Sequence, residues 1–240
     1  SSPPRQSISA NRESSWALET VFDDGTTPVR NWGVLENGMI CCGVPPTAAL
    51  KAFAIGARVE HPQALVDDIQ FGTFAGHEEL GAASYSLTAR VGARGVYSFC
   101  MCPGGYVIPT STEPGHLNVN GMSNSNRGSR WANSAWVVTL EPEDFWLDRP
   151  GDLDDHGALA GLALQRHLES RAFEHGGGGY RAPAQRLTDF MEGRVSADLG
   201  SSSYKPGLTP ADLRALLPAR VGDAIARATL RFDERMRGFL

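Results

Sequence analysis

One feature constrains the fold of this chain more than any other: the spacing of its hydrophobic residues changes near Pro150. Before that point, short runs alternate apolar and polar residues, as in residues 53–60, with the period of two that is typical of a half-buried strand. After it, apolar residues recur at spacings that can line one side of a helix. Strands followed by helices indicate an α+β fold.

This pattern predicts an antiparallel or mixed β-sheet followed by about four helices. Because Gly, Pro, Asn and Ser separate the strands, regular βαβ units are not expected. We expect strands near residues 53–60, 84–91, 95–101, 106–109, 116–121 and 135–140, with a short helix over 63–69. The later helices are expected near residues 159–173, 184–191, 210–217 and 221–236.

Two of the later helices carry more specific expectations. Thr209 is the expected N-cap of the third, with Pro210 at its first helical position. In the last helix, Ile225, Leu230 and Phe232 are expected on the inner side.

The N-terminal part of the chain has a different composition. Residues 1–48 are rich in Ser, Pro, Thr and Gly, with short β-like runs near 29–34 and 38–42. We interpret them as an irregular N-terminal segment and residues 49–240 as the main domain.

Charge and hydrophobicity exclude some classes of partner. The net charge of -5 argues against a nucleic-acid partner, which usually requires a basic face. No run approaches the roughly 18 apolar residues that span a bilayer, and the first residues lack the apolar core of a signal peptide. The sequence therefore predicts a cytoplasmic location, with neither nucleic acid nor membrane as a partner.

The richest segment runs from Arg94 to Gly105, where a strand delivers Cys100 and Cys102 into a Pro-Gly-Gly turn. In an uninterrupted strand both thiols point to one face and can meet one ligand or one flavin ring. The alternative is that both cysteines are small buried core residues. Gly104 and Gly105 permit close approach by a backbone or a cofactor, although a plain turn needs the same residues.

Metal and hydrolase chemistry receive little support. The remaining cysteines form the doublet Cys41-Cys42, and neither pair has the two-to-four-residue spacer of a tetrahedral zinc site. The six histidines are scattered, and neither Gly-x-Ser-x-Gly nor His-Glu-x-x-His occurs. We therefore predict no metal, and a thiol or metal protein remains only a weak third hypothesis.

Several polar residues are candidates for substrate contact. Arg58 and His61 lie on the first strand, where Arg58 and Glu60 share a face and a cross-strand ion pair at the sheet edge is the alternative to a substrate contact. Asn118 and Asn120 share a strand face and can bind a polar ligand or simply favour turns. Lys205 lies in a Tyr-Lys-Pro-Gly segment and can face substrate or solvent.

Several segments, taken in order, resemble a large bacterial group of predicted FAD-dependent dehydrogenases. The similarity begins at residues 51–63, which read Lys-Ala-Phe-Ala-Ile-Gly-Ala-Arg-Val-Glu-His-Pro-Gln, and continues to the end of the chain. The other matching segments are residues 80–85, 94–105, 119–123, 132–134, 176–183, 185, 189–190 and 203–207.

That resemblance implies the substrate-binding, flavin-covering domain of an FAD-dependent oxidoreductase that carries out hydride transfer and is inactive in isolation. Members of the group bind FAD through Gly-x-Gly-x-x-Gly near the N-terminus and through a second segment after the substrate domain. Neither segment is found in this sequence, so the flavin ligands are expected in a dinucleotide-binding region in cis or encoded nearby.

The resemblance also implies which residues face the flavin or a small-molecule substrate. Its aromatic and glycine-rich strand supplies Tyr97, Phe99, Cys100, Cys102, Gly104 and Gly105. Either cysteine is then a candidate catalytic proton donor or redox partner. The alternative function is a non-catalytic ligand-binding or interaction module.

Overall fold

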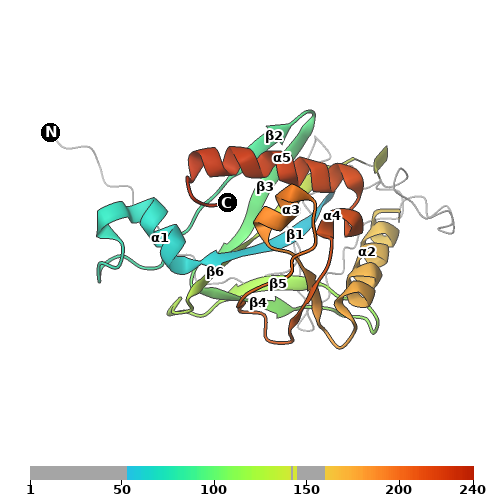
Figure 1. The fold of residues 1–240 in the computed structure, drawn as a ribbon, viewed down its shortest axis with the longest axis horizontal. Helices are drawn as coiled ribbons and strands as arrows, with labels where there is room; N and C mark the ends of the chain where they lie inside the picture. The colour runs from blue at the N-terminus through green and yellow to red at the C-terminus, as the bar shows by residue number, and fades with distance from the viewer. Residues whose placement is uncertain (1–52, 142, 145–159) are drawn as a thin grey trace, which may run out of the picture.

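The computed structural model describes residues 53–141, 143–144 and 160–240, so the β-like runs expected near residues 29–34 and 38–42 lie outside it. The α+β expectation is confirmed (Figure 1). In chain order the elements are β1 (Phe53–Pro62), α1 (Gln63–Phe71), the 3-10 turn η1 (Gly72–Phe74), β2 (Thr88–Val91), β3 (Arg94–Cys102), β4 (Gly105–Pro109), β5 (Val119–Ser123), β6 (Trp131–Leu140), α2 (Ala160–Gly176), β7 (Ala182–Ala184), α3 (Leu187–Glu192), β8 (Leu208–Pro210), α4 (Leu213–Leu216) and α5 (Ala219–Arg235).

The main sheet has four antiparallel strands in the order β1-β6-β3-β2. Strand β6 is central and pairs with β1 along its whole length, from Phe53 opposite Leu140 to Pro62 opposite Trp131. Because side chains alternate along a strand, this register puts Ile55 opposite Val138 on one face and Arg58 opposite Ala135 on the other. The first of these we call the inner face, and the second the outer face.

The inner face is the core of the domain. Helix α5 lies across it and contacts all four strands (Figure 1). The side chains of Val96, Trp136 and Val138 are fully buried there, and the Trp136 ring meets Phe232 of α5 edge-on with 5.1 Å between centroids. Aromatic pairs of this geometry add to the hydrophobic burial that holds helix and sheet together.

The outer face is only partly covered. The two-stranded ribbon β4-β5 packs against β6, β3 and β1 at one end (Figure 1). Beyond the ribbon, the outer face keeps some exposure and presents small apolar side chains together with two aromatic rings. They are Ala54, Gly56, Tyr97, Phe99, Ala135 and Val137.

A buried carboxylate fastens the sheet to the start of α5. Asp144 accepts hydrogen bonds from Arg94 of β3, at 2.6 Å to Oδ1, and from Arg220 of α5, at 2.8 Å to Oδ1. The Glu141 backbone N–H adds a third donor at 2.8 Å. Burial tends to raise the pKa of Asp144, but these donors, Arg94 foremost, hold it below its usual value.

The strand expected over residues 84–91 is shorter than predicted. Burial does alternate there, since Ala83, Tyr85 and Leu87 are buried, but the strand begins only at Thr88. The Tyr85 hydroxyl instead bonds the Ser134 hydroxyl at 2.8 Å on the inner face. Alternating burial therefore arose from side-chain docking rather than from a strand ladder.

Two expectations about the late helices were wrong. Pro210 ends strand β8, which pairs in parallel with β7, and α4 is capped by Asp212, whose carboxylate accepts the Arg214 N–H at 2.9 Å. In α5, Ile225 and Phe232 are buried as expected, but Leu230 is 54% exposed. Leu230 is two residues from Phe232, which places it about 200° around the helix.

Candidate functional site

Arg58 is the centre of the candidate site. Its side chain leaves β1 on the outer face and lies against the end of the sheet that the β4-β5 ribbon covers. The guanidinium donates from Nε to Asn133 Oδ1 at 2.8 Å and from Nη1 to Asn120 Oδ1 at 3.4 Å. Nη2 reaches the Cys100 carbonyl oxygen at 2.6 Å and Cys102 Sγ at 3.2 Å. We call these five residues the Arg58 cluster.

A break in strand β3 shapes the cysteine side of the cluster. Phe99 pairs with Ala135 and Cys102 with Asn133, so β3 has one extra residue there, and Cys100 takes a φ of 45°. This left-handed conformation is uncommon for a residue other than glycine. The expectation that an uninterrupted strand presents both thiols was therefore wrong. Instead, the bulge turns the Cys100 carbonyl and the Cys102 sulfur toward Arg58.

Strand β5 closes the cluster from the opposite side. A Cβ atom at Gly121 would overlap the Arg58 guanidinium and Asn133 Oδ1, so only glycine lets the β5 backbone pass this close. The Asn120 side chain is oriented by the Gly121 backbone N–H, which donates to its Oδ1 at 2.8 Å. The requirement for Gly121 therefore comes from packing against Arg58.

The cluster carries an uncompensated positive charge. Among the residues that the structure describes, no carboxylate forms an ion pair with Arg58. Burial lowers the pKa of the Arg58 guanidinium, and burial raises the pKa of the Cys102 thiol although Arg58 opposes it. The neutral thiol therefore does not balance the cation. Asn133 Nδ2, fully buried in the same cluster, also lacks a hydrogen-bond acceptor.

Glu60, two residues along β1, forms no ion pair within the described residues, and neither does Arg58, so the cross-strand ion pair is not found there. Its carboxylate accepts the Ser203 backbone N–H at 3.0 Å and the Ser203 hydroxyl. The Ser203 hydroxyl oxygen in turn accepts the Val107 backbone N–H at 2.8 Å. Glu60 thus fastens the segment before β8 to β1, and Ser203 links that segment to the β4-β5 ribbon.

His61 lies on the inner face, away from the Arg58 cluster. It is buried, stacks on Phe239 with 3.8 Å between ring centroids, and lies with Nε2 3.1 Å from the Phe239 carbonyl oxygen. A carbonyl only accepts, so Nε2 carries the proton in the neutral ring. Burial lowers the pKa of His61 to about 4. This histidine anchors the C-terminal segment in the aromatic core.

The remaining sequence candidates are dispersed. Asn118 donates to Glu169 of α2 at 3.2 Å, and Lys205 is exposed. The Gly104 and Gly105 turn is buried against the chain itself: the Gly104 N–H donates to Gln63 Oε1 at 2.6 Å, and a Cβ there would overlap the Arg127 carbonyl. Tyr97 and Phe99 lie on the outer face.

Of the predicted site residues, the structure therefore brings together Arg58, Cys100, Cys102 and Asn120. Sequence reasoning did not place Asn133 in the site. The available signal was a single amide inside β6, an otherwise apolar strand whose other polar residues, Ser134 and Thr139, carry hydroxyls.

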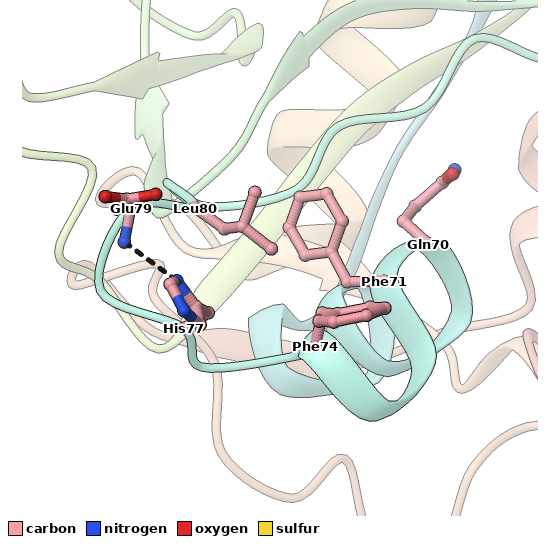
Figure 2. Close-up of a pocket in the computed structure, with 6 residues that line it drawn as sticks. All are labelled: Gln70, Phe71, Phe74, His77, Glu79 and Leu80. Atoms are coloured by element: carbon pink, nitrogen blue, oxygen red, sulfur yellow. Dashed lines mark hydrogen bonds between the residues drawn. The ribbon is translucent and has the colours of Figure 1, made fainter.

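An apolar notch lies apart from this site, beside α1. Figure 2 shows Phe71 and Leu80 pointing toward one another above Phe74, with His77 turned to the Glu79 backbone, whose N–H donates to Nδ1 at 3.3 Å. The notch encloses about 470 Å³, and Phe74 is 67% exposed. Its chemistry is that of a packing surface, because its lining offers one imidazole and one carboxylate and no further titratable group.

The described residues also bear on metal binding and on membrane insertion. No group of three or more His, Cys, Asp or Glu residues within the described ranges is arranged to hold a metal ion. The helices in that part of the chain are all too short or too polar to cross a membrane.

Comparison with known proteins agrees with the flavoprotein resemblance. The family match identifies a domain that is associated with flavoproteins. More specifically, the chain belongs to the family described as FAD-dependent protein, C-terminal domain-like, whose model matches residues 52–240. It is also 46% identical over 193 residues to an uncharacterized protein of Clostridium beijerinckii. That match covers 79% of this chain but 35% of the relative, so the chain spans about a third of the relative's length.

Proposed function

We propose that this chain is the substrate-side, flavin-covering domain of an FAD-dependent oxidoreductase, with the outer face of its sheet turned toward the flavin. The observation that carries the proposal is the Arg58 cluster, in which a partly buried cation forms no ion pair with a carboxylate of the described residues and lies at the end of a mainly apolar face. A partly buried charge without an ion-pair partner is costly, so an arrangement of this kind favours an anion supplied from outside.

The outer face has the chemistry expected for a planar ring system. Its Ala, Gly and Val side chains are short, so a ring can approach the strands closely, and the rings of Tyr97 and Phe99 border that surface. The length of the Clostridium relative supports a flavin-bearing region as the neighbour of this face, because about two thirds of that relative lies outside the match. The matched family is also named for FAD.

FAD, when held by the rest of such a protein, supplies the hydride chemistry. The residues of this chain would then orient the substrate and set the electrostatics. Arg58 is a fixed positive charge, and its four hydrogen bonds hold the guanidinium plane in one orientation. Cys102, kept protonated by burial, holds a proton next to that charge.

The test uses a longer protein that joins this chain to a dinucleotide-binding region. We expect it to be yellow and to catalyse turnover linked to NAD(P)H or a dye. Arg58→Met should lower kcat or shift the flavin reduction potential to more negative values, because an anionic reduced flavin loses a nearby cation. Arg171→Met is the matched control, since within the described residues the Arg171 side chain bonds the Ala215 carbonyl on the helical side and no atom of the Arg58 cluster.

Two results would contradict the proposal. The first is a well-folded longer protein that never retains flavin. The second is an Arg58→Met protein whose turnover and reduction potential equal those of the Arg171→Met control. If Cys100→Ser and Cys102→Ser also alter only stability, the non-catalytic ligand-binding or interaction module becomes the better description.

A further inference from the structure

A second cationic site lies at the free edge of the sheet, outside the Arg58 cluster. Strand β2 is the edge strand, and α5 passes beside it on the inner face. At this edge is a surface depression of about 400 Å³, lined by Arg231 and Arg235 of α5 together with Arg90 of β2 and Tyr97 of β3. Most of its lining surface is polar, in contrast to the notch beside α1.

The two helix arginines are oriented by the sheet. Arg231 and Arg235 are one helical turn apart, so they project in the same direction. Arg231 donates from Nη1 to the Arg90 carbonyl, and Arg235 donates from Nη1 to the Thr88 carbonyl at 2.8 Å. A guanidinium has five N–H donors, so each bond fixes the group and leaves the rest of its fork available.

These arginines form no ion pair with a carboxylate of the described residues. The ion pairs there involve other arginines, such as Arg94 with Asp144 and Arg214 with Asp223, and none involves Arg90, Arg231 or Arg235. Like charges one turn apart on a helix disfavour the helix. One neutral donor at each position would be enough to bond the edge carbonyls of β2. Three guanidinium groups that form no ion pair with a described carboxylate, gathered around one depression, therefore need a further explanation.

The ring of Tyr97 also lines the depression. The Tyr97 ring lies over the backbone of Gly95, where any Cβ atom would overlap it, and Tyr97 is 41% exposed. Guanidinium forks match phosphate oxygens in a bidentate manner, and an exposed ring stacks on a heteroaromatic base. The depression therefore combines hydrogen-bond donors for phosphate with a ring on which a base can stack, and a nucleotide site uses both.

We infer that this depression binds the diphosphate of a soluble pyridine dinucleotide. The inference rests on the proposed function, because a flavin oxidoreductase exchanges hydride with dinucleotides of this class, whereas the diphosphate of its own FAD is expected at the Gly-x-Gly-x-x-Gly segment outside this chain. Arg231 and Arg235 grip the phosphates, Arg90 adds charge from the strand, and Tyr97 stacks on a base.

Binding is measured first by calorimetry on the 240-residue chain, with ADP-ribose and inorganic pyrophosphate as probes. The double variant R231Q/R235Q should weaken both by at least about tenfold, the loss expected when charge-assisted bonds are removed. R231K/R235K should be intermediate because lysine cannot bind in a bidentate manner. Tyr97→Leu should weaken ADP-ribose binding and leave pyrophosphate binding unchanged. Arg227→Gln is the control, one turn earlier on α5 and outside the lining.

The same variants in the longer, flavin-containing protein test whether the soluble dinucleotide is the ligand. A raised KM for NAD(P)H with FAD retained supports the inference, whereas loss of retained FAD would contradict it. The inference is overturned if R231Q/R235Q binds both probes as the Arg227→Gln control does. If the probes bind through the arginines but the longer protein retains no flavin, the proposed function fails and the diphosphate site stands.

Discussion

His61 provides a quantitative test of the inner-face packing. Burial lowers its pKa to about 4, against about 6.5 in an unfolded chain. Between these values the unfolded chain binds one more proton than the folded one, so the free energy of unfolding falls as pH falls. The slope is about 1.4 kcal/mol per pH unit, which removes about 2 kcal/mol between pH 6.5 and pH 5 and about 3 kcal/mol by pH 4.

The perturbation is replacement of His61 by side chains that do not titrate. His61→Phe keeps a ring to stack on Phe239, and His61→Gln keeps a donor for the Phe239 carbonyl. Urea unfolding followed by circular dichroism from pH 7.5 to pH 5 gives the free energy of unfolding at each pH. For both variants, the slope of the free energy of unfolding against pH should be smaller than that of the wild type by about 1.4 kcal/mol per pH unit, which corresponds to one proton. If the three curves run parallel, His61 is not buried as a neutral ring and the reasoning is refuted.

Three further predictions concern stability, measured by the same urea assay. Gly104→Ala should cost more than Gly92→Ala, because both positions have positive φ, worth about 1 kcal/mol of strain, but a Cβ meets backbone atoms only at Gly104; equal losses would contradict the close packing. Asp144→Asn should lower the free energy of unfolding by about 2 kcal/mol at neutral pH, because it weakens charge-assisted hydrogen bonds. The difference from wild type should shrink as pH falls through the lowered pKa of Asp144. A difference that does not depend on pH would count against this role of Asp144. Tyr85→Phe should cost about 1–2 kcal/mol because Ser134 loses its buried partner; Ser84→Ala, at an exposed neighbouring residue, is its control.

Periodicity predicted the elements well where local pattern and tertiary pairing agree. Strand β1 and the inner positions Ile225 and Phe232 of α5 followed from spacing alone. It failed where contacts distant in sequence decide the conformation. The residues before Thr88 alternate in burial without a strand partner, and Pro210 joins a parallel pair with β7 instead of opening a helix. A short window of sequence shows neither the lack of a pairing strand before Thr88 nor the pairing of Pro210 with β7.

The candidate site was predicted in part for the same reason. Arg58, Cys100, Cys102 and Asn120 were named individually, but the bulge that joins them depends on the register between β3 and β6. A one-residue insertion changes which atoms face Arg58, so side-chain alternation alone misassigned the thiols. Arg231 and Arg235 of α5 were not predicted, because their partners are backbone carbonyls of β2 and every residue type carries a backbone carbonyl.

The central position of β6 has a consequence for synthesis of the protein on the ribosome. Within the described residues β1 pairs with β6 alone, and β3 pairs with β6 on one side and β2 on the other. At about 5–20 residues per second, the roughly 80 residues from the end of β1 to the end of β6 take about 4–16 s to translate. Throughout that interval β1 has unpaired edges while the β2-β3 hairpin can already close. Nascent chains arrested before Trp131 should therefore be strong clients of chaperones, and arrest beyond Leu140 should reduce that dependence.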